Sequence, residues 1–166
     1  MDPADYQGFL THLASVGLHY RWSTIGYCLM PNHVHLVIEA PVAAVSRGMR
    51  DLTGTYARRF HRRHQTSGHL FGGRFHAVPV LDDRQLMTVV RYVGLNPTAA
   101  GLCADPADWP WSSLGGAMGR RPADPCLSTE RLWALLDGDQ RAGRAALHQL
   151  ITGTPVPGTY QSGVLC

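Results

Sequence analysis

Residues 27–41 read YCLMPNHVHLVIEAP, and this stretch decides the sheet of the protein. Residues 19–28 and 34–39 are rich in β-branched and aromatic side chains, which predicts two strands. The Pro-Asn pair between them is a tight-turn signal, so we expect the strands to form a hairpin. Pro41 ends the second strand, because proline cannot donate a hydrogen bond to a neighbouring strand.

His33 and His35 are the strongest local sign of chemistry. Residues i and i+2 of a strand point to the same face of a sheet, so the two imidazoles could chelate one divalent ion. Val34, Leu36 and Ile38 alternate with them and should face the core from the other side. A His-x-His motif is short, and taken alone it is more often a pair of surface histidines.

Two amphipathic helices are expected on either side of the hairpin. Residues 3–16 and 42–64 carry apolar side chains at spacings of three and four. The second helix ends in the basic run YARRFHRRH, which suits a helix C-terminus. Residues 74–80 (RFHAVPV) alternate, and Pro79 indicates a strand at the edge of the sheet.

A further helix is expected from Asp82 to about Leu95. Asp82 suits the N-cap with Gln85 at the capping-box position, and the Asn-Pro pair at 96–97 should end the helix. Four apolar residues form the face toward the core: Leu86, Val89, Val90 and Val93.

A polar stripe runs along the same helix. Steps of four from Arg84 reach Thr88, Tyr92 and Asn96. Asn96 could present its carbonyl oxygen to a metal one turn from the Tyr92 hydroxyl. A tyrosine needs a metal or a nearby base to attack a phosphate, so the stripe alone favours an ordinary half-buried tyrosine.

The 166 residues fit one compact domain with an appendage. Residues 103–125 are loop-like and hold four prolines, and a helical pattern resumes at Ser128. We therefore expect a main domain at residues 1–121 and a helical accessory tail at residues 122–166.

The composition bears on the cellular location of the protein. No uncharged apolar window long enough for a membrane span occurs, and the N-terminus MDPADYQGFL lacks the basic start of a secretion signal. None of the four cysteines forms a CxxC pair, so we expect free thiols. These features indicate a cytoplasmic protein without a membrane partner.

All fifteen basic residues are arginine, and nine of them lie between positions 47 and 91 with only three acids, a local charge of +6. Arginine binds phosphate in a bidentate way, so a nucleic-acid partner is expected. Codon composition explains the missing lysines equally well, but not the clustering. Six arginines are candidate DNA contacts, with a solvated helix face as the alternative: Arg58, Arg59, Arg62, Arg63, Arg74 and Arg91.

Together these motifs resemble a known family. YCLMPNHVHLVIEAP resembles the HUH motif (histidine, hydrophobic residue, histidine) of single-tyrosine transposases. RYVGLNPTAAGL followed by DWPWSSLGG resembles the second signature of their REP-associated tyrosine transposase branch. The likeness runs from about residue 3 to 116 in the same order.

The resemblance implies an α+β fold of the HUH, ferredoxin-like type, with helices packed on one face of an antiparallel sheet. Family members carry a first strand with a motif like YHVTxRG beside the histidine strand. Residue 1 lies almost at the first helix, so we expect that strand to be missing and one sheet edge to be unpaired.

The resemblance also implies roles. His33 and His35 match the metal-binding pair, Asn96 completes the metal site, and Tyr92 matches the nucleophile. The family binds Mg²⁺ or Mn²⁺, cuts single-stranded DNA next to a hairpin through a 5′-phosphotyrosine link, and often works as a homodimer. Separately from the resemblance, Trp109 and Trp111 could stack bases, although packing of their loop on the domain is the simpler expectation.

Two other functions fit the same residues. One is a catalytically inactive hairpin-DNA-binding relic of the family. The other is an unrelated hydrolase that uses a metal held by His33 and His35.

Overall fold

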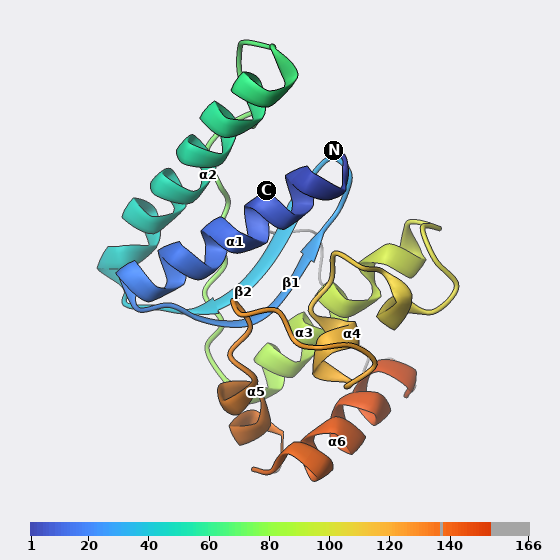
Figure 1. The fold of residues 1–166 in the computed structure, drawn as a ribbon. Helices are drawn as coiled ribbons and strands as arrows, with labels where there is room; N and C mark the ends of the chain where they lie inside the picture. Colours follow the sequence, from blue (N-terminus) through green and yellow to red (C-terminus); the bar gives the residue numbers. More distant parts are fainter. Residues whose placement is uncertain (137, 154–166) are drawn as a thin grey trace.

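The computed structural model describes residues 1–136 and 138–153. Helices surround a small antiparallel sheet, so the expected α+β class is confirmed (Figure 1). The elements in chain order are α1 (Pro3–Tyr20), β1 (Ser23–Leu29), β2 (Val34–Glu39), α2 (Val42–His64), α3 (Asp83–Ala99), a 3-10 turn η1 (Pro106–Asp108), α4 (Leu114–Ala117), α5 (Thr129–Leu135) and α6 (Gln140–Thr152).

The expected hairpin is present. β1 and β2 pair antiparallel, with Cys28 opposite His35 and Leu29 opposite Val34. β1 begins later than predicted because α1 continues to Tyr20. A capping box at Asp2 starts that helix, and Arg21 ends it in the left-handed conformation with a φ of 57°.

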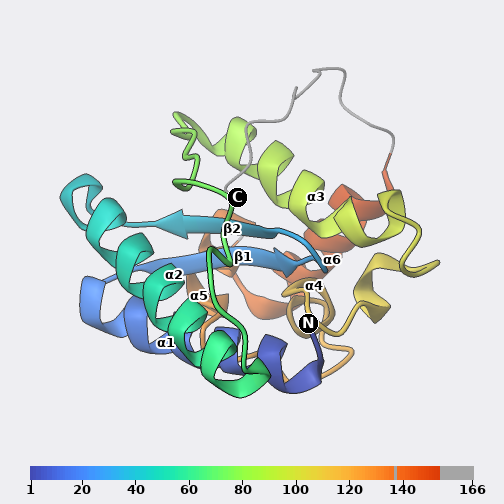
Figure 2. The same cartoon turned by 90° about the horizontal axis from the view of Figure 1, so that it is seen from above.

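Helices cover both faces of the sheet, so the expectation of helices on one face is wrong (Figure 2). α1 and α2 pack on the face that carries Tyr27, Leu29 and Leu36. α3 and the C-terminal helices pack on the face that carries Ile25 and Val37. The histidine side of the hairpin therefore faces a second core, which buries His35, while His33 at the end of the hairpin stays partly exposed.

Chain segments after α3 complete the far side of β1. Leu29 N donates to Trp111 O at 2.8 Å, and Ser128 N donates to Thr24 O at 2.8 Å. The stretch expected to be loop-like thus contains two short helical turns and satisfies one edge of the sheet.

The C-terminal helices share the core of the tyrosine helix. Leu132, Trp133, Leu147 and Ile151 belong to the same buried cluster as Val90. The boundary between residues 121 and 122 remains a prediction about folding units, but α5 and α6 pack on the main body.

Residues 74–80 do not form the predicted edge strand. A strand needs a neighbour that pairs with its main chain, and the described sheet contains only β1 and β2. In that part of the chain no strand lies beside the outer edge of β2.

α3 runs to Ala99 and does not stop before Pro97. A proline removes one helical hydrogen bond, and here the helix continues past it to a terminus where Ala100 N donates to Asn96 O at 3.0 Å.

Cys28, Cys103 and Cys126 are free thiols, as expected, and Cys166 lies outside the described residues. None of the described helices is both long and apolar enough to cross a bilayer.

Candidate metal site and nucleophile

Three side chains converge between the hairpin and α3. His33 Nε2 lies 2.9 Å from His35 Nε2, and His35 Nε2 lies 3.0 Å from Asn96 Oδ1. Imidazole nitrogens and an amide oxygen are ligands of divalent metals, and the oxygen suits Mg²⁺ and Mn²⁺. The structure therefore brings the three predicted ligands together, and a single cation among them would fit these donors.

Asn32 orients the His33 ring. Its Oδ1 lies 2.8 Å from His33 Nδ1. If Nδ1 carries the proton and donates it to this oxygen, the lone pair of His33 Nε2 points toward His35. From the sequence Asn32 was interpreted only as a turn residue. Its position directly before His33 is the one feature of the sequence that could have indicated that it orients the His33 ring.

Both imidazoles are shifted toward the neutral form. The pKa of His35 falls to about 4, mainly because the side chain is buried and also because His33 lies beside it, while the contact with Asn96 opposes the shift. Partial burial also lowers the pKa of His33. Neutral imidazole is the form that binds a metal, so the pair is ready for a cation near pH 7.

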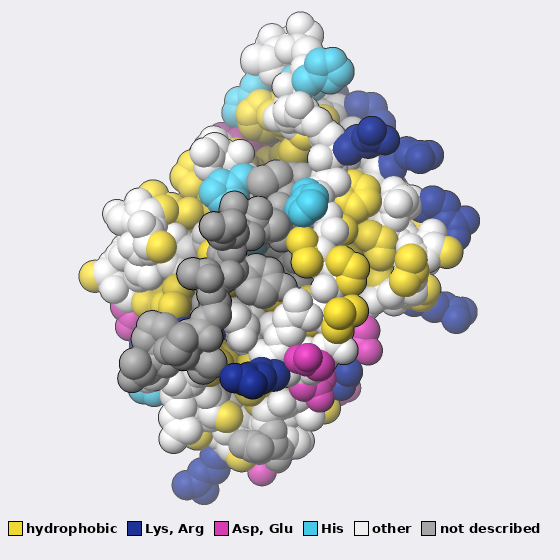
Figure 3. Space-filling model, turned by 180° about the vertical axis from the view of Figure 1, so that it is seen from behind, with side chains coloured by type: hydrophobic (Ala, Val, Ile, Leu, Met, Phe, Trp, Pro, Cys, Tyr) yellow, Lys and Arg dark blue, Asp and Glu magenta, His cyan; other side chains and the backbone are white. Residues whose placement is uncertain are grey.

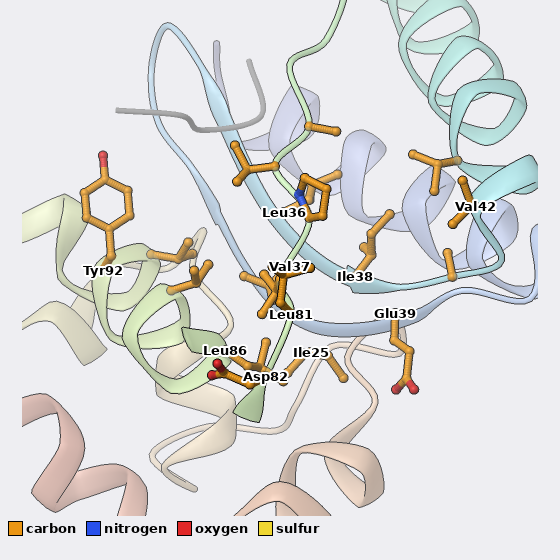
Figure 4. Close-up of a pocket in the computed structure, with 18 of the residues that line it drawn as sticks. Ile25, Leu36, Val37, Ile38, Glu39, Val42, Leu81, Asp82, Leu86 and Tyr92 are labelled. Atoms are coloured by element: carbon orange, nitrogen blue, oxygen red, sulfur yellow. The ribbon is translucent and has the colours of Figure 1, made fainter. Parts of the chain in front are cut away.

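Tyr92 stands one helical turn before Asn96. Its ring centroid lies 5.7 Å from that of His35, with the ring planes at 74°. Asn96 Nδ2 donates to the Tyr92 carbonyl oxygen at 2.8 Å, which leaves Asn96 Oδ1 free to face the histidines. Figure 4 shows the Tyr92 ring projecting from α3 with the hydroxyl at its far end.

The packing of α3 explains this arrangement. Val90 and Val93 are buried in the cluster that includes Ile25 and Val37 of the sheet. The polar stripe on the adjacent side of α3 then lies at the margin of that contact, where Asn96 meets His35. Leu86 and Val89 are partly buried against the same cluster, so the predicted apolar face is confirmed.

The six candidate DNA-binding arginines separate into two groups. Arg58, Arg59 and Arg62 are exposed on α2, and basic side chains line that edge of the molecule (Figure 3). Arg74 is exposed in the connection before α3. Arg63 and Arg91 bind groups that are distant in the chain, whereas Arg58 donates to the nearby Thr55 hydroxyl at 2.7 Å.

Arg91 holds the end of α6. Its guanidinium donates to the carbonyl oxygens of Leu150, of Ile151 at 2.6 Å and of Gly153 at 2.9 Å. These bonds satisfy carbonyls that the last turn of a helix leaves without partners. They tie the C-terminal helices to the residue next to Tyr92.

Arg63 closes an ion-pair network at the start of α1. Its Nη1 lies 2.7 Å from Asp2 and 2.6 Å from Asp5, and His64 Nε2 lies 3.0 Å from Asp5. The hydrogen bond from Arg63 is the largest influence on the pKa of Asp2, which falls to about 2. Asp2, Asp5 and His64 have metal-ligand spacing, but Arg63 already balances the two carboxylates.

The tryptophans of the DWPWSSLGG segment pack within the protein. Trp109 Nε1 donates to Leu29 O at 3.0 Å, and the Trp111 ring stacks on Tyr6 with centroids 4.7 Å apart. The simpler expectation, packing of this loop on the domain, is confirmed.

The site thus consists of a histidine pair on a hairpin that faces a tyrosine and an asparagine on a packed helix. These groups form a candidate metal site with a phenol nearby. The model of the family described as Transposase IS200 like matches residues 3–96, more than half of the chain, and the chain belongs to that family.

A relative from Haemophilus influenzae, provisionally named a REP-associated tyrosine transposase, is 27% identical over 108 residues. The match covers 58% of this chain and 61% of that protein, so the chain spans less than two thirds of its relative. No solved structure gives a significant match to the chain.

Proposed function

We propose that the protein is a metal-dependent endonuclease and strand transferase that acts on single-stranded DNA at hairpin-flanked sites. The observation that supports this most is the convergence of His33, His35 and Asn96 within 3.0 Å contacts, one helical turn from Tyr92. Membership of the transposase family makes DNA the expected substrate. A DNA substrate also agrees with the cytoplasmic location expected from the sequence.

The proposed reaction uses Tyr92 as the nucleophile. Its oxygen attacks a backbone phosphorus and loses the phenolic proton, while the bond from phosphorus to the 3′ oxygen breaks. The products are a 5′-phosphotyrosine link and a strand that ends in a protonated 3′-OH. The covalent link preserves the phosphodiester energy, so a second 3′-OH can rejoin the strand by the reverse attack.

His33, His35 and Asn96 would hold Mg²⁺ or Mn²⁺. Bound there, the cation supplies charge withdrawal from the phosphate oxygens and orients the phosphate for in-line attack. Asn32 supports the site because it sets the orientation of the His33 ring.

The exposed arginines of α2 are the proposed contacts to DNA phosphates. Arg58, Arg59 and Arg62 are accessible, and Arg74 can join them. Arg63 and Arg91 make weaker candidates, since their guanidiniums are occupied by carboxylates and by the end of α6. We also propose that the protein acts as a homodimer, which is common in the family that the sequence resembles.

A covalent-adduct assay tests this function. The full chain is incubated with Mn²⁺ and a hairpin oligonucleotide labelled at its 3′ end, because a 5′-phosphotyrosine retains the 3′ fragment. We expect a labelled protein band on a denaturing gel that disappears with EDTA and with Tyr92→Phe. Tyr92→Phe should still bind the oligonucleotide, which shows that the variant is folded.

Two results would favour the alternatives. Binding of the hairpin without any adduct, with all metals tested, would indicate an inactive DNA-binding relic. Cleaved DNA without a protein link, unaffected by Tyr92→Phe, would indicate a metal-dependent hydrolase that uses only the histidine pair.

A further inference from the structure

The C-terminal helices connect the hairpin to the tyrosine helix α3. We call the described residues from Ser128 to Gly153, which include α5 and α6, the C-terminal strap. At the start of the strap, Ser128 N donates to Thr24 O of β1 at 2.8 Å. Arg131 Nε lies 2.6 Å from Glu39 Oε2 at the end of β2. At its other end, α6 packs on α3 (Figure 1). The strap therefore contacts both elements that carry the candidate metal site.

The two helices of the strap pack tightly on each other. A Cβ at Gly143 of α6 would lie 2.7 Å from Trp133 Cε3 of α5, so this close approach requires glycine. Leu132 of α5 and Leu147 of α6 are buried in the cluster that also contains Val90 of α3. A close-packed unit of this kind resists deformation, so the strap can hold its two ends at a fixed separation.

The contact of α3 with the sheet is mainly apolar. Val90 and Val93 lie in the same buried cluster as Ile25 and Val37 of the sheet. The hydrophobic effect is non-directional, so these contacts keep the helix on the sheet but define its rotation and its position along its axis less closely. Hydrogen bonds have preferred distances and angles, and they fix both.

Arg91 supplies such directional contacts between α3 and the strap. Its guanidinium donates to three carbonyl oxygens at the end of α6, those of Leu150, Ile151 and Gly153. The last carbonyls of a helix carry a partial negative charge, which favours a cation there. Further along α3, a Cβ at Gly94 would lie 3.1 Å from Ile151 Cδ1, so α6 also approaches the main chain of α3 closely. Tyr92 lies between these two contacts in the sequence.

The reach of Tyr92 and Asn96 toward the histidines depends on where α3 is held. Asn96 Oδ1 lies 3.0 Å from His35 Nε2, and Asn96 Nδ2 donates to the main chain of Tyr92. Both side chains project from one helix, so a slide or rotation of α3 would move the phenol and the amide together. A misplacement of about 1 Å can reduce the rate of a reaction about a hundredfold.

We propose that the C-terminal strap holds α3 in register with the histidine pair, and that Arg91 is the positioning residue through which it does so. In this role the Arg91 guanidinium stays on the end of α6 and does not contact DNA. The inference rests on the proposed function, because it takes Tyr92 as the nucleophile. It adds that helices outside the site set the position of that nucleophile.

Adduct formation by the full chain under single-turnover conditions tests the proposal. The chain is kept in excess over the 3′-labelled hairpin oligonucleotide with saturating Mn²⁺, and its concentration is varied. Arg91→Met should lower the maximal rate about tenfold or more, because Tyr92 is misplaced. The chain concentration that gives half of this rate should change by less than about twofold, because no DNA contact is lost.

Matched variants separate positioning from other roles. Arg91→Lys keeps a cation that can donate to the same carbonyl oxygens, so it should recover part of the maximal rate. Arg84→Met, an exposed change on the same helix, should leave both quantities unchanged. Circular dichroism shows whether each variant is folded at the assay temperature.

A second measurement needs neither DNA nor metal. Hydrogen exchange of residues 90–99 should be about fivefold or more faster in Arg91→Met than in the wild-type chain, and unchanged in Arg84→Met. A wild-type chain that forms no adduct would refute the proposed nuclease function, and this measurement would then decide whether the strap holds α3.

Three results would overturn the proposal. One is an unchanged maximal rate in Arg91→Met. Another is a loss that saturating chain concentrations restore, with a salt slope reduced by about 1, since that pattern identifies a phosphate contact. The third is unchanged exchange of residues 90–99 in Arg91→Met.

Discussion

Asn96 Oδ1 lies 3.0 Å from His35 Nε2, although the two residues are 61 positions apart in the chain. This contact joins α3 to the sheet, and Asn96 Nδ2 meanwhile donates to the Tyr92 carbonyl oxygen. The geometry of the candidate site thus depends on how α3 packs against the hairpin.

Asn96→Leu, which keeps the side-chain size but removes the oxygen, should weaken Mn²⁺ binding by about tenfold or more. Asn96→Asp keeps an oxygen ligand and adds charge, so its affinity should be retained. Isothermal titration calorimetry of the metal-free protein measures both. Equal affinity in wild type and Asn96→Leu would exclude Asn96 from the metal site.

The metal-free protein should lose stability in acid because of His35. This side chain is 2% exposed, and its pKa of about 4 lies below the value of about 6.5 in an unfolded chain. The unfolded state therefore binds the proton more readily, and the free energy of unfolding falls as pH drops from 6.5 to 4, by up to about 3 kcal/mol. Urea denaturation at several pH values should show a smaller fall in His35→Gln.

Two glycines of α2 provide a packing test. A Cβ at Gly48 would lie 2.9 Å from Trp22 Cε2 and closer still to Cζ2, so Gly48→Ala should reduce the free energy of unfolding by about 1–3 kcal/mol. At Gly54 the nearest atom is Arg58 Nη1 at 3.5 Å, the end of a flexible side chain. Gly54→Ala should raise stability by up to about 1 kcal/mol through helix propensity. Chemical denaturation of both variants decides whether α2 packs on Trp22 in this way.

Arg91→Met should loosen α6, because it removes the donors to three carbonyl oxygens at the end of that helix. We expect faster hydrogen exchange within residues 140–152 and a loss of about 1–2 kcal/mol in stability. Arg84→Met, an exposed position on the same helix, is the control and should change neither. Unchanged hydrogen exchange in Arg91→Met would contradict the role of Arg91 in holding the end of α6.

DNA binding should depend on salt and on the exposed arginines of α2. Arg58→Gln and Arg62→Gln should each weaken binding to a hairpin oligonucleotide and reduce the slope of log affinity against log salt by about 1. Arg141→Gln, an exposed change on α6, is the control. Fluorescence anisotropy at several salt concentrations measures the slopes, and identical slopes for all variants would place the DNA elsewhere.

Local patterns in the sequence predicted the elements well. The bounds of α2 are those expected from its apolar spacing, and the hairpin follows from two β-rich runs around a Pro-Asn turn. The histidines share one side of the hairpin because a strand alternates, and Tyr92 and Asn96 share one side of α3 because a helix repeats every 3.6 residues. These features were predictable because they depend only on neighbours in the chain.

Long-range packing decided the rest. Only the fold shows that α3 covers the histidine face and buries His35, and that Arg63 and Arg91 bind groups far away in the sequence. The alternating run at 74–80 failed as a strand because no described strand pairs with it. A sequence encodes the period of an element through local sterics, whereas burial, ion pairs and strand partners arise only when distant segments meet, and this meeting also forms the candidate site.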